Sequence, residues 1–229
     1  MSLSWYINRI RSMTAPEVAH RLREKALKLT ARRRLEGWDL YLPIPVHSPF
    51  TPLAPGLSSA CPDLRTKILH AADLAVSGGF VALGRDWPTP TDPDPYPETL
   101  WTLDPVTGKQ WTGVGRFCFD IPYRHERTLG DVKYVWERNR LQFLQPLAAA
   151  ALISDDPIYL RTAERIVLSW VAANPPFRGL VWASGIEVAL RAISLLVLMG
   201  LIGDRLSDQV RDAIGSVLHA GSVANFVGV

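Results

Sequence analysis

The pattern of hydrophobic and polar positions is clearest in residues 131–220, where apolar side chains recur every three or four positions. This is the period of an amphipathic helix. The spacing predicts helices near 132–153, 157–173, 183–202 and 205–219. The connections between them are short, and short connections make successive helices antiparallel neighbours. The C-terminal part, residues 131–229, is therefore expected to be an array of αα-hairpins.

The N-terminal segment, residues 1–36, reads as basic and amphipathic, with one or two helices predicted over 4–36. Thr14-Ala15-Pro16-Glu17 is typical of a helix start, with a hydroxyl side chain, an early proline and an acidic residue. Val18, Leu22, Ala26 and Leu29 then recur on one face. We expect that face to be buried and the Arg and Lys side chains to lie in solvent. Contact with RNA or anionic lipid is the alternative use of this segment.

Residues 37–131 have a different pattern, rich in proline, with the densest stretch at 86–98. Proline lacks the backbone donor that a helix interior needs, so a continuous helix is excluded there. One helix is predicted over 63–77, and short strands are predicted over 80–83 and 115–119. The rest is expected to be loop. The predicted fold class is thus mainly α, with a loop-rich N-terminal part.

Composition narrows the class of protein further. The chain has 229 residues, 48% of them hydrophobic, which excludes global disorder and fits one large domain or two small ones. Its net charge of +3 does not by itself indicate nucleic acid. Two cysteines make neither a disulfide framework nor a zinc site. The beginning of the chain lacks an apolar signal segment, and the longest apolar run is too short to span a bilayer. We therefore predict a cytoplasmic protein without stable membrane insertion.

Two charged stripes lie on predicted helices. Lys133, Glu137 and Arg140 fall on one helix face, where a solvated ladder of ion pairs is the simplest interpretation. Ser184, Glu187 and Arg191 share a face of a helix that is otherwise apolar nearly all round, which indicates burial. Buried charges must be paired or line a cavity. Either a Glu187–Arg191 pair or a polar cleft satisfies this requirement.

The loop before the second stripe contains Arg178 and Trp182. An aromatic ring beside a guanidinium suits an acidic sugar, because the ring packs on the sugar face and the guanidinium binds carboxylate or sulfate. Packing of Trp182 in the core between two helices remains the other interpretation. The histidines are scattered, and no common nucleotide, hydrolase or metalloprotease motif is present.

Two ordered boxes resemble the heparinase II/III family of polysaccharide lyases. They are D-V-K-Y-V-W-E-R-N-R-L-Q-F-L at 131–144 and S-W-V-A-A-N-P-P-F-R-G-L-V-W-A-S-G-I-E-V-A-L-R-A-I-S at 169–194. The resemblance implies part of an incomplete (α/α) toroid, followed in the family by a β-sandwich. Members cleave uronic-acid-containing polysaccharides by β-elimination. That reaction needs a group that neutralises the uronate, a base, usually Tyr or His, and an acid for the leaving oxygen.

The sequence departs from the family after His219, because it contains no Asn-His dipeptide and ends in AGSVANFVGV. We therefore expect the N-terminal piece of a lyase, inactive alone, with no catalytic residue, metal or cofactor of its own. The resemblance places the substrate-binding wall of the cleft at Glu137, Asn139, Arg140, Trp182, Ser184 and Glu187.

The expected partner is an acidic polysaccharide rather than nucleic acid. An unclosed toroid would also leave an apolar flank through which copies of the chain could associate. In the family the working compartment is usually outside the cytosol, which makes the periplasm the alternative location. A non-catalytic carbohydrate-binding or scaffolding domain, linked to bacterial exopolysaccharide metabolism, is the alternative function.

Overall fold

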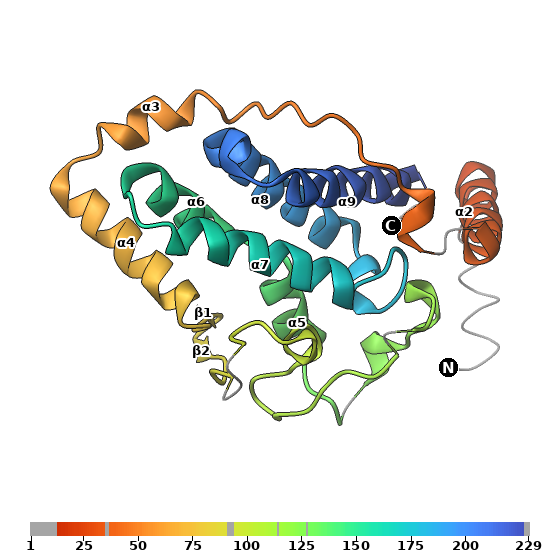
Figure 1. Cartoon of the computed structure of the whole chain (residues 1–229). Coiled ribbons are helices and arrows are strands. Elements are labelled where there is room, and N and C mark those ends of the chain that lie inside the picture. Colours follow the sequence, from red (N-terminus) through yellow and green to blue (C-terminus); the bar gives the residue numbers. More distant parts are fainter. Residues whose placement is uncertain (1–12, 35–36, 91–93, 114, 127, 227–229) are drawn as a thin grey trace.

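The computed structural model describes residues 13–34, 37–90, 94–113, 115–126 and 128–226, and it is mainly helical, as the hydrophobic period predicts (Figure 1). The α-helices are α2 (Ala15–Arg34), α3 (Leu53–Ser58), α4 (Pro62–Val76), α5 (Val132–Asn139), α6 (Leu144–Ile153), α7 (Ile158–Ala173), α8 (Gly185–Ile202) and α9 (Asp208–Phe226). Short 3-10 helices lie at Trp38–Leu40, Glu98–Thr102, Cys118–Asp120, Tyr123–His125, Leu180–Trp182 and Gly203–Arg205. Strands β1 (Val81–Ala82) and β2 (Arg85–Asp86) form one antiparallel hairpin.

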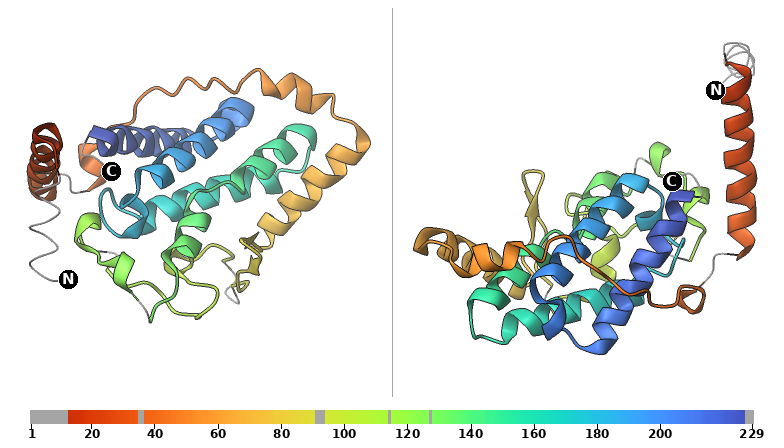
Figure 2. Two further views of the ribbon diagram at one scale, coloured as in Figure 1. Left: turned by 180° about the vertical axis from the view of Figure 1, so that it is seen from behind. Right: turned by 90° about the horizontal axis from the view of Figure 1, so that it is seen from above.

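The helices of the C-terminal half form two stacked αα-hairpins, α6–α7 and α8–α9. The hairpins stack so that α6 packs beside α8 and α7 beside α9, while α4 covers the other side of α6 (Figures 1 and 2). The predicted array of hairpins is thus present. The stack places the N-terminal end of α8 next to α5, which positions the candidate site described below.

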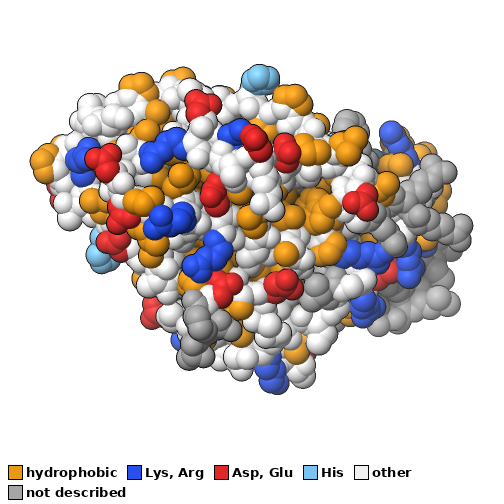
Figure 3. Space-filling model, viewed as in Figure 1, with side chains coloured by type: hydrophobic (Ala, Val, Ile, Leu, Met, Phe, Trp, Pro, Cys, Tyr) orange, Lys and Arg blue, Asp and Glu red, His pale blue; other side chains and the backbone are white. Residues whose placement is uncertain are grey.

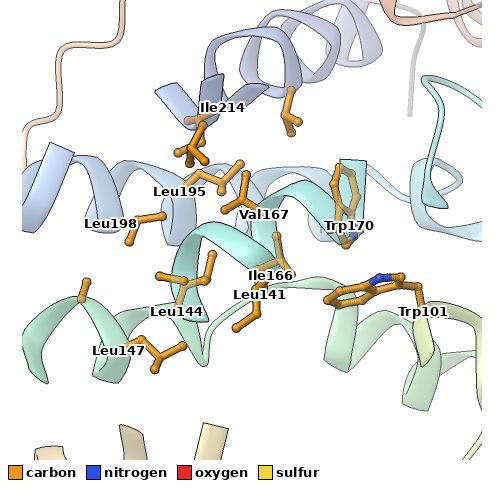
Figure 4. Close-up of a cluster of buried hydrophobic side chains, with 14 of the residues drawn as sticks. Trp101, Leu141, Leu144, Leu147, Ile166, Val167, Trp170, Leu195, Leu198 and Ile214 are labelled. Atoms are coloured by element: carbon orange, nitrogen blue, oxygen red, sulfur yellow. The ribbon is translucent and has the colours of Figure 1, made fainter. Parts of the chain in front are cut away.

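The main core lies where these helices meet, and aliphatic side chains fill it (Figure 4). Burying a leucine- or isoleucine-sized side chain contributes about 1.5–3 kcal/mol, so the layer stabilises the stack. Trp101 and Trp170 close one end of the layer, and both rings are completely or almost completely buried. The aliphatic members labelled in the figure are Leu141, Leu144, Leu147, Ile166, Val167, Leu195, Leu198 and Ile214.

The helix predicted over 132–153 is interrupted, which corrects the sequence-based prediction. Leu141 adopts a left-handed backbone with φ of 58°, and this residue separates α5 from α6. Pro146 explains why the break occurs here. Within a continuous helix its ring would clash with the carbonyl of Gln142, but near the start of α6 it is tolerated.

The proline-rich middle contains the predicted helix over 63–77 as α4, and also α3, which the pattern did not predict. The strand predicted over 80–83 is present in shortened form as β1. The strand predicted over 115–119 is wrong. Phe117 makes a single antiparallel bridge to Arg178, and a 3-10 turn begins at Cys118.

An extended strap, residues 42–52, crosses the outside of α8 and α9 (Figure 1). Ser48 Oγ donates to the Leu196 carbonyl at 2.5 Å, and His219 Nδ1 lies 3.0 Å from the Leu42 carbonyl. Gly200 lets the strap approach closely, since a Cβ there would lie 2.6 Å from Ser48 Oγ.

The N-terminal segment forms a helix from Ala15 to Arg34, while residues 1–12 and 35–36 lie outside the described part. The expected burial of its apolar face is wrong. Leu22 and Leu29 are 64% and 58% exposed, and α2 stands beside the body of the molecule (Figure 2).

Candidate functional site

Helices α5 and α8 bring three charged side chains of the two stripes into one cluster. Arg140 donates from Nε to Glu187 Oε2 at 2.6 Å and from a second nitrogen to Glu187 Oε1 at 3.1 Å. It also pairs with Glu137 on its own helix. The side chains of Arg140, Glu137 and Glu187 are 22%, 12% and 6% exposed. Hydrogen bonding to Glu187 is the main cause that raises the pKa of Arg140. The interpretation of Lys133, Glu137 and Arg140 as a solvent-exposed ladder of ion pairs is therefore wrong, because Glu137 and Arg140 are largely buried.

A second guanidinium, that of Arg191, lies completely buried beneath this cluster. It donates to the carbonyls of Asn139 at 3.0 Å and Val181 at 2.7 Å. It also lies over the Trp170 ring at 4.4 Å. These contacts replace the direct Glu187–Arg191 pair considered from the sequence. Burial lowers the pKa of the Arg191 guanidinium, and the negative charge of Glu187 opposes that shift.

Asn139 lies in the core, although it was expected on the cleft wall. Its amide donates to the carbonyls of Trp101 and Val135, each at 2.8 Å, and its side-chain oxygen accepts from Trp170 Nε1 at 2.8 Å. Every strong hydrogen-bonding position of this side chain is thus used inside the protein. Asn139 has the role of holding α5 against α7.

Trp182 also lies in the core, so the structure supports its interpretation as a packing residue. The ring is completely buried and stacks on Phe177 at 5.7 Å between ring centres. It also meets Trp38 edge-on at 6.2 Å. A side chain so enclosed has no surface left for a sugar.

A groove opens between the segment 123–136 and the start of α8. It consists of two adjoining hollows of about 670 and 510 Å³ that share Tyr123, Arg124 and Ser184. Residues that line only the larger hollow are Glu126, Gly130, Asp131, Val132, Lys133 and Trp136. Residues that line only the smaller one are Ala183, Gly185, Ile186 and Ala189. We call this feature the α5/α8 groove.

The α5/α8 groove combines two aromatic rings with two exposed cations. Tyr123 and Trp136 meet edge-on at 5.2 Å, and Trp136 Nε1 donates to the Leu180 carbonyl at 3.0 Å, which fixes the ring. Arg124 is exposed, and the Lys133 side chain is 73% exposed.

The carboxylates of the groove are engaged locally. Glu126 accepts from the Thr128 amide and hydroxyl, each at 2.6 Å, and Asp131 caps α5 by accepting from the Lys133 amide at 3.0 Å. The Lys133 ammonium lies 4.0 Å from Asp131, at the limit of an ion pair. The groove therefore combines two exposed cations and two carboxylates, whose formal charges balance, with apolar ring faces.

Ser184 is the one of the six predicted wall residues that lines the α5/α8 groove. Glu137, Arg140 and Glu187 form the charged cluster, and Asn139 and Trp182 belong to the core. The sequence-based reasoning missed Tyr123, Arg124 and Trp136 as lining residues. Tyr123 and Arg124 lie in a 3-10 turn after Pro122, where no helical period marks one face. Trp136 is an apolar residue of α5, and the helical period alone does not separate a groove position from a core position.

Two further candidates point elsewhere. Tyr134 packs edge-on against Trp87 at 5.8 Å, and it does not line the α5/α8 groove. Arg178 donates to the Gly115 carbonyl at 3.2 Å and so links its loop to residues 115–117.

Comparisons with protein-family models, with curated proteins and with solved structures found no match to this chain. Within the described ranges, no three His, Cys, Asp or Glu side chains come together in a way that could hold a metal ion. One helical stretch, Gly185–Arg205, is long and apolar enough to cross a membrane, but half of its most apolar window is buried inside the protein. Core helices of soluble proteins share these properties.

Proposed function

We propose that this chain supplies the acidic-polysaccharide-binding part of a polysaccharide lyase of the heparinase II/III type. One observation carries the proposal. The two sequence boxes that resemble the family meet through Arg140 and Glu187, and residues of both boxes, Lys133, Trp136 and Ser184, line one groove together with Tyr123 and Arg124. The boxes are separated along the chain by residues 145–168, and they would not need to converge on one groove if each served only its own helix.

The chemistry of the groove suits a uronic-acid polymer. Arg124 can form paired hydrogen bonds to a carboxylate or sulfate, and Lys133 adds a second, mobile positive charge. Tyr123 and Trp136 offer ring surface to the apolar face of a sugar. The first turn of α8, at Ser184 and Gly185, adds the partial positive charge of a helix N-terminus, with no side-chain cap in place.

The charged cluster has a positioning role in this proposal. Arg140 holds Glu137 and Glu187 together and so fixes the start of α8 against α5. That contact keeps Ser184 opposite Lys133, because each lies about one helical turn before a member of the cluster. The groove then presents a preformed shape, which lowers the entropy cost of binding a stiff polymer.

In this proposal the described residues bind and orient the glycan, and proton transfer belongs to groups outside the groove. β-Elimination requires a base at C5 of the uronate and an acid at the leaving oxygen. The described residues that line the groove include one tyrosine and no histidine. We expect no release of unsaturated uronate when this chain alone is mixed with heparan sulfate or alginate.

A non-catalytic glycan-binding or scaffolding domain is the second candidate. The absence of the Asn-His dipeptide from the printed sequence favours it. Both candidates predict glycan binding, and they differ only in turnover. Unsaturated uronate, followed by its ultraviolet absorbance, would exclude the scaffold and contradict the expected inactivity.

The binding test uses affinity electrophoresis or calorimetry with alginate and heparan sulfate, and with dextran as the neutral polymer. We expect binding to the acidic polymers only. The double substitution Arg124→Ala and Lys133→Ala is expected to weaken it by about tenfold or more, since two charge-assisted contacts are lost. The matched control is Lys67→Ala with Arg85→Ala, which removes two exposed cations elsewhere.

The control variant should bind as the unchanged protein does. Equal binding to dextran, or equal losses in the groove and control variants, would refute the groove as the glycan site. Failure of the unchanged chain to bind any acidic polymer would refute the proposed function.

A further inference from the structure

The apolar face of α2 points away from the protein. In an ordinary surface helix the apolar face is the one that contacts the core. Ala15, Val18, Leu22, Ala26 and Leu29 follow one another at intervals of three or four residues and so share one face. Leu22 is 64% exposed and Leu29 is 58% exposed. A surface helix of a globular protein normally turns this stripe toward the core. No described part of the chain covers Leu22 or Leu29.

Other positions of α2 make the contacts with the body. Ala31 is buried, the Lys28 ammonium lies 4.5 Å from the centre of the Phe119 ring, and Arg32 pairs with Asp120 at 3.0 Å. At 100° per residue, Ala31 lies opposite Leu22, and Lys28 and Arg32 lie on the flank of the helix between them. Figure 2 shows that the N-terminal end of α2 extends beyond the body. Leu22 and Ala26 of the leucine face are exposed, and Val18 is half-buried.

Basic residues border the leucine face on both edges. Arg21 and Lys25 lie on one edge, and Arg23 lies on the other, as the helical spacing requires. The helix contains seven Lys and Arg residues against two Glu, although the whole chain is only +3 and carries both signs of charge on the face drawn in Figure 3.

This charge decides between the occupants of the leucine face. A second copy of α2 would bring two strongly positive helices together, and like charges at that distance repel. A soluble acidic polymer would pair with the charges but leave the leucines in water. An anionic bilayer surface satisfies both features, because the leucines enter the acyl boundary and the basic residues remain at the headgroups.

We propose that α2 lies flat on an anionic membrane surface, with Leu22 and Leu29 in the bilayer and the body of the protein on the aqueous side. The geometry permits this without unfolding, since Leu22 and the buried Ala31 lie on opposite sides of α2. The attachment is peripheral and reversible, as expected for one amphipathic helix. It holds the 3-10 turn at Cys118–Asp120, which contacts α2, near the membrane.

The test is sedimentation of the full chain with vesicles. One set contains equal parts of phosphatidylglycerol and phosphatidylcholine, and the other contains phosphatidylcholine alone. We expect binding to the first set, weakened by high salt, and little binding to the second. The double substitution Leu22→Gln and Leu29→Gln is expected to lower the partition coefficient about tenfold or more. Circular dichroism and thermal unfolding confirm that each variant folds.

The matched control is Leu53→Gln with Leu64→Gln, two leucines of similar exposure on α3 and α4. It should bind vesicles as the unchanged chain does. A second variant, Arg21→Gln with Arg23→Gln and Lys25→Gln, should lose the preference for anionic vesicles.

Vesicle binding that survives the Leu22/Leu29 change would overturn the proposal. Binding to soluble heparin or RNA that the Arg21/Arg23/Lys25 change abolishes, without any binding to vesicles, would overturn it as well, and would identify α2 as a polyanion site. The groove variant Arg124→Ala with Lys133→Ala should leave vesicle binding unchanged, so this test is independent of the proposed glycan function.

Discussion

Arg140 is expected to be the residue whose loss most clearly reports the junction of α5 and α8. Replacement by Met keeps most of the side-chain volume but removes the guanidinium that joins Glu137 and Glu187. Two carboxylates would then face each other in a largely buried place. The Glu187 carboxylate would lose two hydrogen bonds, which the structure gives as 2.6 and 3.1 Å.

The size of the effect follows from the burial of the three side chains. Removing one partner from a fully buried ion pair costs about 3–5 kcal/mol, because an unpaired charge is left behind. Arg140 is 22% exposed and Glu187 is 6% exposed, so water screens part of the interaction. We therefore expect Arg140→Met to lower the free energy of unfolding by about 2–4 kcal/mol at neutral pH.

Urea unfolding followed by tryptophan fluorescence measures this loss, since Trp101, Trp170 and Trp182 are buried in the core. Lys67→Met is the matched control. It breaks the Lys67–Asp63 pair, whose side chains are 71% and 75% exposed. An exposed pair on one helix contributes only about 0.3–0.5 kcal/mol.

A second variant tests the origin of the loss. Adding Glu187→Gln to Arg140→Met removes one of the two unpaired charges and should restore part of the stability. If Arg140→Met costs no more than Lys67→Met, or if the added substitution makes the protein still less stable, our account of the junction is refuted.

Two further predictions concern other parts of the fold. Burial raises the pKa of the Cys118 thiol from 9.0 to about 12, so the stability it contributes is complete below pH 9 and is lost as the pH rises toward 12. Urea unfolding should show a smaller alkaline loss of stability in Cys118→Ala than in the unchanged protein. In the native protein, an aromatic disulfide reagent should label the exposed Cys61 but not the buried Cys118. Rapid labelling of both thiols in the native protein would contradict this prediction. Gly200→Ala should lower the unfolding free energy by about 1–3 kcal/mol, because the added Cβ would lie 2.8 Å from the Phe50 carbonyl carbon, while Gly203→Ala meets only the flexible Met199 side chain. Equal effects of the two glycine changes would show that the strap does not lie against α8.

The helices of the C-terminal half were predictable because the spacing of apolar residues within each helix is visible in the sequence itself. The apolar period placed α7 and α8 closely, and the short connections paired the helices into hairpins. The prediction of one helix over 132–153 failed because a single residue, Pro146, had more influence on the backbone than the spacing of the apolar residues. Pro146 lies in a strongly apolar run that favours a continuous helix, yet its missing donor and its ring require the break before α6.

The candidate site was predictable only in part, because spacing gives the face of a helix but not its neighbour. Glu187 and Arg191 share a stripe, which suggested that they pair. In the structure Glu187 instead forms an ion pair with Arg140 at the end of α5, and Arg191 donates hydrogen bonds to backbone carbonyls. Arg124 and Tyr123 lie in an irregular turn, so no period identified them as groove residues.

The amino-acid sequence alone determined that the chain is mainly helical, where α4, α7 and α8 begin and end to within about two residues, and that charged residues recur at helical spacing in two boxes. These properties depend on neighbours within a few positions of the chain. Only the tertiary structure decided that Asn139 and Trp182 are core residues, that Arg140 joins the two boxes, and that the leucine face of α2 is turned outward. Each of these depends on which element packs against which, and residues far apart in the sequence settle that packing.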